Sequence, residues 1–75
     1  MTLKYKEYIV NREEDFTENG IAKVKANLSV IIDVIGSNQI NPMVVTLDVI
    51  SLNDAKGSEM DSQREQECID FVNKY

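Results

Sequence analysis

The sequence predicts an α+β fold, in which a small three-stranded antiparallel sheet is followed by one C-terminal helix packed on one face, in the order β-β-β-α. Of the 16 valines and isoleucines, 12 lie between residues 21 and 50, and β-branched side chains favour strands over helices. Apolar and polar residues alternate from 22 to 34, and the apolar spacing becomes helical after residue 57. These observations predict one small domain over residues 1–75.

The two central strands are predicted over about residues 22–35 and 43–52. Turn-forming residues around Gly36 and Pro42 separate them, so they form a hairpin. We expect even residues of the first strand to pair with odd residues of the second, because this register makes one continuous apolar face. A slip of one residue would bury Asp48 opposite Val30.

An outer strand is predicted over about residues 3–10, where Lys4 and Lys6 suit the edge of a sheet. Residues 11–20 are too polar for a strand and too few for a clear helix, so the sequence predicts a loop or a single turn there.

The C-terminal helix is predicted over about residues 59–74. One stripe of its surface is apolar apart from one arginine, and Ser58 and Ser62 are candidate N-caps. The stripe consists of Met60, Arg64, Cys68, Phe71, Val72 and Tyr75, with Ile69 beside it.

Charge and composition exclude several classes of protein. The net charge of -5 and the pI near 4.5 oppose direct binding to nucleic acid. No apolar run approaches the roughly 20 residues that cross a membrane. The first residues are charged where a signal peptide would be apolar, and Cys68 is the single cysteine, so we expect a reducing, cytoplasmic setting.

The sequence also lacks the residues of common catalytic sites. It has no histidine, which removes the usual general base and metal ligand, and no phosphate-binding glycine motif. Cys68 is expected to pack in the core. Asp33 and Asp48 interrupt apolar strands, either as exposed groups that aid solubility or as an acid and base couple. We expect no enzyme activity, no cofactor and no metal.

Two sets of residues are candidates for contact with a protein partner. The apolar set points away from the helix in the register above or lies in the hairpin tip: Ile31, Ile35, Ile40, Val44, Ile50 and Leu52. The acidic set lies in two segments, 11–20 and 58–75, that each carry a net charge of -3: Glu13, Glu14, Asp15, Glu18, Glu59, Asp61, Glu65 and Glu67.

The leading hypothesis is a non-enzymatic protein-interaction module that binds and occludes the surface of another protein. The alternative is an acidic nucleic-acid mimic that inhibits a nucleic-acid enzyme, of the anti-restriction or anti-CRISPR type that phages and mobile elements use. The third is a structural subunit of a homo-oligomer. The apolar set serves the first and third hypotheses. The acidic helix is a second contact region in the first hypothesis, and the acidic set serves the second.

Overall fold

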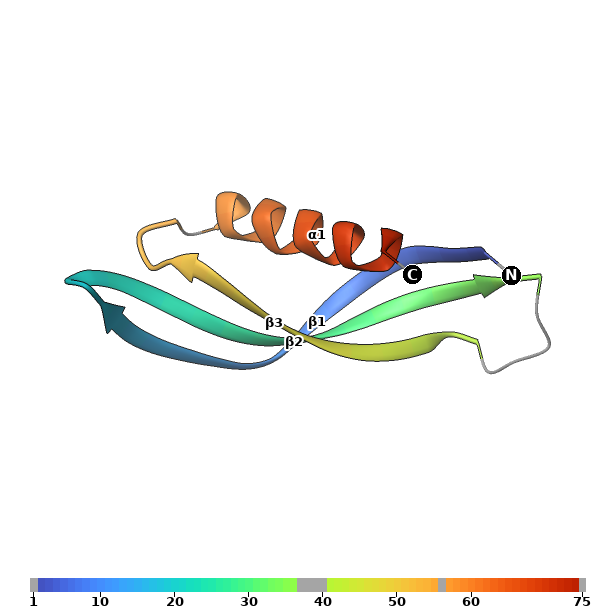
Figure 1. Ribbon diagram of the computed structural model, residues 1–75, viewed down its shortest axis with the longest axis horizontal. Coiled ribbons are helices and arrows are strands. Elements are labelled where there is room, and N and C mark those ends of the chain that lie inside the picture. Colours follow the sequence, from blue (N-terminus) through green and yellow to red (C-terminus); the bar gives the residue numbers. More distant parts are fainter. Residues whose placement is uncertain (1, 37–40, 56, 75) are drawn as a thin grey trace.

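The computed structural model describes residues 2–36, 41–55 and 57–74. It contains β1 (Thr2–Glu18), β2 (Ile21–Ile35), β3 (Met43–Leu52) and α1 (Ser58–Asn73). The strands form one open antiparallel sheet in the order β1-β2-β3, and α1 lies across one face of it (Figure 1). The predicted fold class is confirmed.

The predicted register of the central hairpin is also confirmed. Leu28 pairs with Leu47 and Val30 pairs with Val45, so even residues of β2 and odd residues of β3 share the face that α1 covers. Asp48 is exposed opposite Asn27 on the other face.

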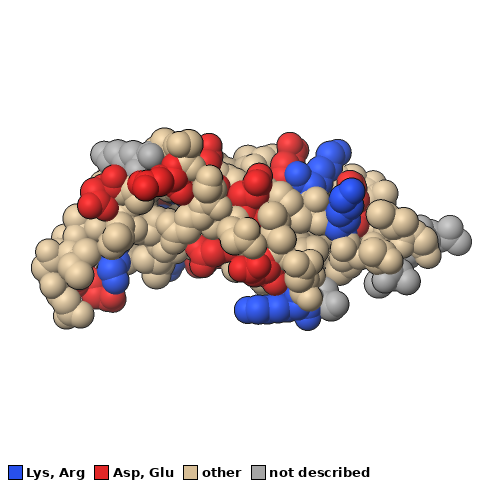
Figure 2. Space-filling model, turned by 90° about the horizontal axis from the view of Figure 1, so that it is seen from above, with Lys and Arg blue, Asp and Glu red and all other residues tan. Residues whose placement is uncertain are grey.

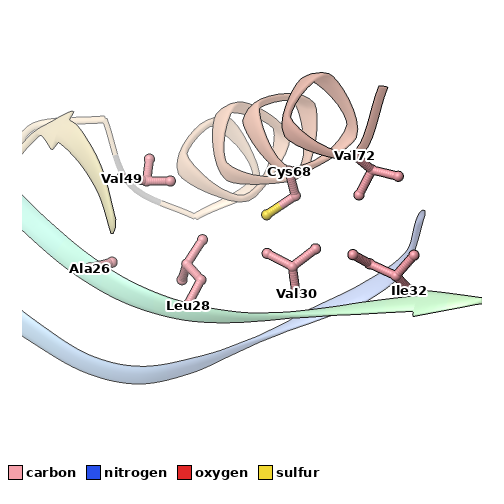
Figure 3. Close-up of a cluster of buried hydrophobic side chains, with 7 residues drawn as sticks. All are labelled: Ala26, Leu28, Val30, Ile32, Val49, Cys68 and Val72. Carbon is pink, nitrogen blue, oxygen red and sulfur yellow. The ribbon is translucent and has the colours of Figure 1, made fainter. Parts of the chain in front are cut away.

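The core lies between this face and the predicted stripe of α1 (Figure 3). Cys68 and Val72 of the helix pack against side chains of β2 and β3, and Cys68 is fully buried. The stripe residue Tyr75 lies outside the described residues. The buried cluster consists of Ala26, Leu28, Val30, Ile32, Val49, Cys68 and Val72.

The predicted loop over residues 11–20 is wrong, because β1 continues as far as Glu18. Asn19 and Gly20 form a two-residue turn with φ of 52° and 77°, the left-handed values that join strands with the natural twist. Residues 12–18 then pair with β2 from Asn27 back to Ile21. Polar side chains fit there because β1 is an edge strand, and most of residues 12–18 are exposed.

Two irregularities interrupt the pairing of β1 with β2, and the first keeps three apolar side chains on the covered face. The register with β2 shifts between Tyr5 and Glu7, and again between Val10 and Arg12, so Lys6 and Asn11 are extra residues in bulges. In a regular strand odd and even residues face opposite sides, so Leu3 and Tyr5 would lie on the face opposite Tyr8. Because of the bulge at Lys6, all three are half-buried against the core.

The helix begins at Ser58, and Gly57 occupies its N-cap position with φ of 68°. The expected caps, Ser58 and Ser62, are therefore wrong, since both lie inside the helix and no side chain caps it. A glycine fits the cap because its backbone adopts a positive φ without strain. In the part of the chain that the structure describes, no helix is both long and apolar enough to cross a membrane.

The molecule is elongated, with extents of 48 × 19 × 18 Å. Its radius of gyration is 14.0 Å, whereas about 11 Å is typical for a compact domain of this length. The 16 residues of α1 span about 24 Å, so the helix covers about half of the sheet along its length. Among the described residues, no helix covers the remaining length or the opposite face.

Leu28→Ala is expected to remove a large share of the stability of the chain. A domain of this size unfolds with about 4–11 kcal/mol, and truncation of a fully buried leucine costs about 3 kcal/mol. Val44→Ala is the matched control, because Val44 is 56% exposed and should cost less than about 1 kcal/mol. Urea unfolding followed by circular dichroism measures both. Equal losses in the two variants would contradict the core assigned above.

Candidate protein-interaction surface

The sheet face opposite α1, called the outer face below, carries most of the exposed apolar side chains. Among the described residues, seven large hydrophobic side chains are exposed, and six of the seven lie on this face at 49–56% exposure. The seventh, Val10, faces the helix side. The six are Ile9, Ile21, Ile35, Val44, Ile50 and Leu52.

The candidate apolar residues share the outer face but do not form one patch. Ile31 and Val44 are cross-strand neighbours at one end, whereas Ile50 and Leu52 lie toward the other end. Val44 and Ile50 are six positions apart, or about 20 Å along an extended strand. Ile35 lies beyond Asp33, and the candidate Ile40 lies outside the described residues.

A row of hydrogen-bonded polar side chains, called the polar ladder below, crosses all three strands between the two apolar ends. The Nδ2 of Asn11 donates to Oδ1 of Asn27 at 3.0 Å and to Oγ of Ser29 at 2.8 Å. The Nδ2 of Asn27 donates in turn to Oδ1 of Asp48 at 2.9 Å, and Lys25 lies 3.8 Å from the same carboxylate. The outer face is therefore apolar at its ends and polar in its centre.

The geometry decides between the two interpretations of Asp33 and Asp48. Asp33 pairs with Lys4, and Asp48 pairs with Asn27. Positions 27 and 33 of β2 are about 20 Å apart, so the two carboxylates cannot share a proton or a substrate atom. The acid and base interpretation is wrong, and both residues are charged groups of the outer face.

Two tyrosines of β1 attach the sheet to the acidic side of α1. The Tyr8 hydroxyl donates to the carboxylate of Asp61, and the Tyr5 hydroxyl donates to Oε2 of Glu65 at 3.5 Å. Burial, followed by these carboxylates, raises the pKa of each tyrosine to about 12. A groove of about 380 Å³ runs beside them, lined by Tyr5, Glu7, Tyr8, Val10, Asp61, Ser62 and Glu65.

Arg64 is a buried cation on the otherwise apolar stripe of α1. Its side chain is 6% exposed, and Nη2 lies 3.6 Å from Oε2 of Glu13 on β1. The Nε and Nη2 atoms have no hydrogen-bond partner among the described residues. An ion pair of this length recovers only part of the cost of removing a guanidinium from water.

The candidate acidic residues do not form a single ridge. Glu13 and Asp15 lie on the helix side of β1, whereas Glu14 and Glu18 lie on the outer face. Figure 2, which views the α1 side, shows acidic side chains scattered between uncharged ones. Several carboxylates also have partners within the chain: Glu13 with Arg64, Glu18 with Lys23, Asp61 with Tyr8 and Glu65 with Tyr5.

Burial gives Cys68 the character of a core residue. The thiol is fully buried, and this desolvation, with Glu67 and Glu65 nearby, raises its pKa to about 11, so little thiolate forms at neutral pH. Over residues 2–36, 41–55 and 57–74, no three acidic, cysteine or histidine side chains gather in a way that holds a metal ion.

Comparison with known protein families, with curated proteins and with solved structures finds no match to this chain. The assignment of a function therefore depends on the surface described above.

Three features of this surface are missed by sequence reasoning. The polar ladder includes Asn11, which the sequence places in a loop, and the tyrosine contacts depend on the bulge at Lys6. The Asn19-Gly20 pair is a strong hairpin signal and would have extended the strand to Glu18. No sequence pattern indicates the pairing of Arg64 with Glu13.

Alkaline pH is expected to destabilise the fold. The pKa values of Cys68, Tyr5 and Tyr8 are about 11, 12 and 12, above the ordinary 9 for cysteine and 10 for tyrosine. The folded state therefore holds protons that the unfolded state releases, and its stability falls as pH rises from about 9 to 12. Urea unfolding across this range measures the loss. Tyr8→Phe should show a shallower fall, and a stability unchanged up to pH 12 would contradict the assignment.

Replacing the buried cation should cost nothing. Arg64→Met removes an incompletely hydrogen-bonded guanidinium, so we expect unchanged stability or a gain of about 1 kcal/mol. Glu13→Ala leaves that cation without its partner and should cost about 1 kcal/mol, a modest figure because Glu13 is half-exposed. Glu14→Ala, one residue along on the outer face, is the control. A large loss in Arg64→Met would show that the ion pair is a main source of stability.

Proposed function

We propose that the chain is a non-enzymatic protein-interaction module, whose outer face binds the surface of a partner protein and occludes it. The observation that supports this proposal is that six of the seven exposed large hydrophobic side chains among the described residues lie on the face opposite α1. Exposed apolar side chains that gather on one face mark contact sites more often than side chains scattered over the whole surface.

The pattern of the outer face suits recognition as well as affinity. Exposed isoleucine, valine and leucine side chains at its ends gain free energy when a partner removes them from water. The polar ladder between them requires matching hydrogen-bond groups on the partner, since an unmatched Asn27 or Asp48 would be costly to bury. A partner with two apolar contact points and a polar centre fits this surface.

The acidic mimic is supported less well by the same geometry. Mimicry of a nucleic-acid backbone needs a row of free negative charges, whereas Asp61 and Glu65 accept hydrogen bonds from tyrosines and Glu13 faces Arg64. The acids are also divided between the two faces of the molecule.

The proposal is tested by charge introduced on the outer face at strands β1 and β2. Ile9→Asp and Ile31→Asp should each weaken partner binding at least tenfold, because each places a carboxylate in the apolar contact. The matched control is Glu59→Gln combined with Glu67→Gln, which removes two helix charges and should change binding less than threefold. Capture from the native host with mass spectrometry identifies the partner, and calorimetry then measures each variant.

Salt dependence separates the two functions. Apolar contact with the outer face should persist at about 0.5 M salt, whereas charge mimicry should weaken steeply and compete with duplex DNA or RNA for the partner. Loss of binding in the glutamine variant, with retention in Ile9→Asp, would reject the outer-face proposal in favour of mimicry.

A further inference from the structure

The two edges of the sheet differ in how they are protected against pairing with another strand. The β1 edge has bulges at Lys6 and Asn11 and is rich in charge. The β3 edge pairs with β2 over ten residues without a register shift, and Asp48 is its one charged residue. A long, regular, apolar edge of this kind readily accepts a further strand.

The backbone of β3 presents alternate residues to that edge. The N–H of Asn53 donates to the carbonyl of Ala22 at 3.0 Å, so odd positions 43–53 direct their backbone groups toward β2 and even positions direct them outward. Consistent with this, the Ile50 carbonyl accepts a hydrogen bond from Gln63 Nε2 at 3.3 Å, and a carbonyl has a second lone pair for another donor.

We propose that two copies of this chain associate through their β3 edges, antiparallel about a twofold axis at Leu47, to form a continuous six-stranded sheet with both helices on one face. This interaction uses the strand edge rather than the outer face, so it goes beyond the proposed function and does not depend on it.

Side-chain complementarity selects this register. With the axis at Leu47, Val44 lies opposite Ile50 of the second copy, and Thr46 lies opposite Asp48 of the second copy, so apolar groups meet apolar groups and a hydroxyl meets a carboxylate. Placing the axis at Asp48 would bring two carboxylates together. Placing it at Thr46 would set Val44 opposite Asp48. A shift of the pairing by one residue would set outer-face side chains of one copy opposite helix-side side chains of the other.

The pairing also unites the apolar ends of the outer face. In one chain Ile31 and Val44 lie about 20 Å from Ile50, but in the pair they adjoin Ile50 and Leu52 of the second copy. Each interface therefore contains two equivalent apolar clusters, as twofold symmetry requires.

The exposed area of the chain exceeds that of a compact monomer. The molecule exposes 5181 Å², whereas about 4,650 Å² is expected for a folded monomer of 8.5 kDa. The elongated shape accounts for this excess and leaves the full length of the β3 edge at the surface. A groove of about 200 Å³ between α1 and β3, lined partly by Leu47 and Phe71, lies beside the proposed axis.

Sedimentation velocity of the full chain tests the association, with an expected dimer of about twice 8.5 kDa. Thr46→Asp places a carboxylate opposite Asp48 of the second copy twice per dimer and should weaken association at least tenfold. Thr46→Lys places an opposite charge there and should keep or strengthen it. Both substitutions are at an exposed position, and circular dichroism at low concentration confirms that each variant folds.

Oxidative cross-linking tests the register. Leu47 of the two copies forms a non-hydrogen-bonded pair with Cα atoms about 4.5 Å apart, a distance that a disulfide spans. Leu47→Cys should therefore cross-link into a dimer under mild oxidation. Val45→Cys is the control, since Val45 faces Val49 of the second copy and should cross-link at least tenfold more slowly.

Three outcomes would overturn the pairing. They are a monomer up to about 1 mM, an equal response to Thr46→Asp and Thr46→Lys, and cross-linking no faster in Leu47→Cys than in Val45→Cys. A monomer that still binds a partner through Ile9 and Ile31 would overturn the pairing alone and leave the proposed function intact. A dimer in the Leu47 register, with no protein that binds the outer face, would support the pairing and overturn the proposed function.

Discussion

The alternation along β2 is the constraint on which the rest of the structure depends. Its even residues from Val24 to Val34 are buried, so its odd residues must point to the opposite face. One helix of 16 residues covers a single face of a three-stranded sheet, and only about half of its length. The chain therefore stabilises its core with one face and leaves the other to water or to another protein, and the polar ladder together with the apolar ends reflects that division.

Much of the fold follows from two periodicities that the sequence displays plainly. The alternation over residues 22–34 and the concentration of valine and isoleucine up to residue 50 predict both central strands. Their register follows because a slip would bury Asp48. The change to helical spacing predicts α1 with Cys68 and Val72 facing inward. The missed part of β1 has a physical reason. Most of residues 12–18 are exposed, so they show no alternation, and the Asn19-Gly20 turn was their one clear signal.

The sequence predicts which face of the sheet the candidate apolar residues occupy, but not how they are arranged on that face. Period-2 spacing places Ile31, Val44 and Ile50 on the outer face, yet it says nothing about what lies between them. The division by the polar ladder depends on the bulge that brings Asn11 beside Asn27, and bulges leave little trace in a sequence. The contacts from Tyr5 and Tyr8 to α1 likewise join segments more than 50 residues apart, where local pattern carries no information.

The bulge at Lys6 determines which side chains of β1 face the helix on each side of it. Downstream of it Tyr8 faces the helix, and upstream Tyr5 and Leu3 face the helix only because one residue is accommodated outside the ladder. Deletion of a single residue at this point has two possible structural outcomes. The strand loses the bulge and the upstream side chains keep facing the helix, or the bulge is kept and Lys4 turns toward the core. A deletion at the bulge can therefore be accommodated by loss of the bulge. A deletion at a regular position of the strand moves the side chains on one side of it to the opposite face.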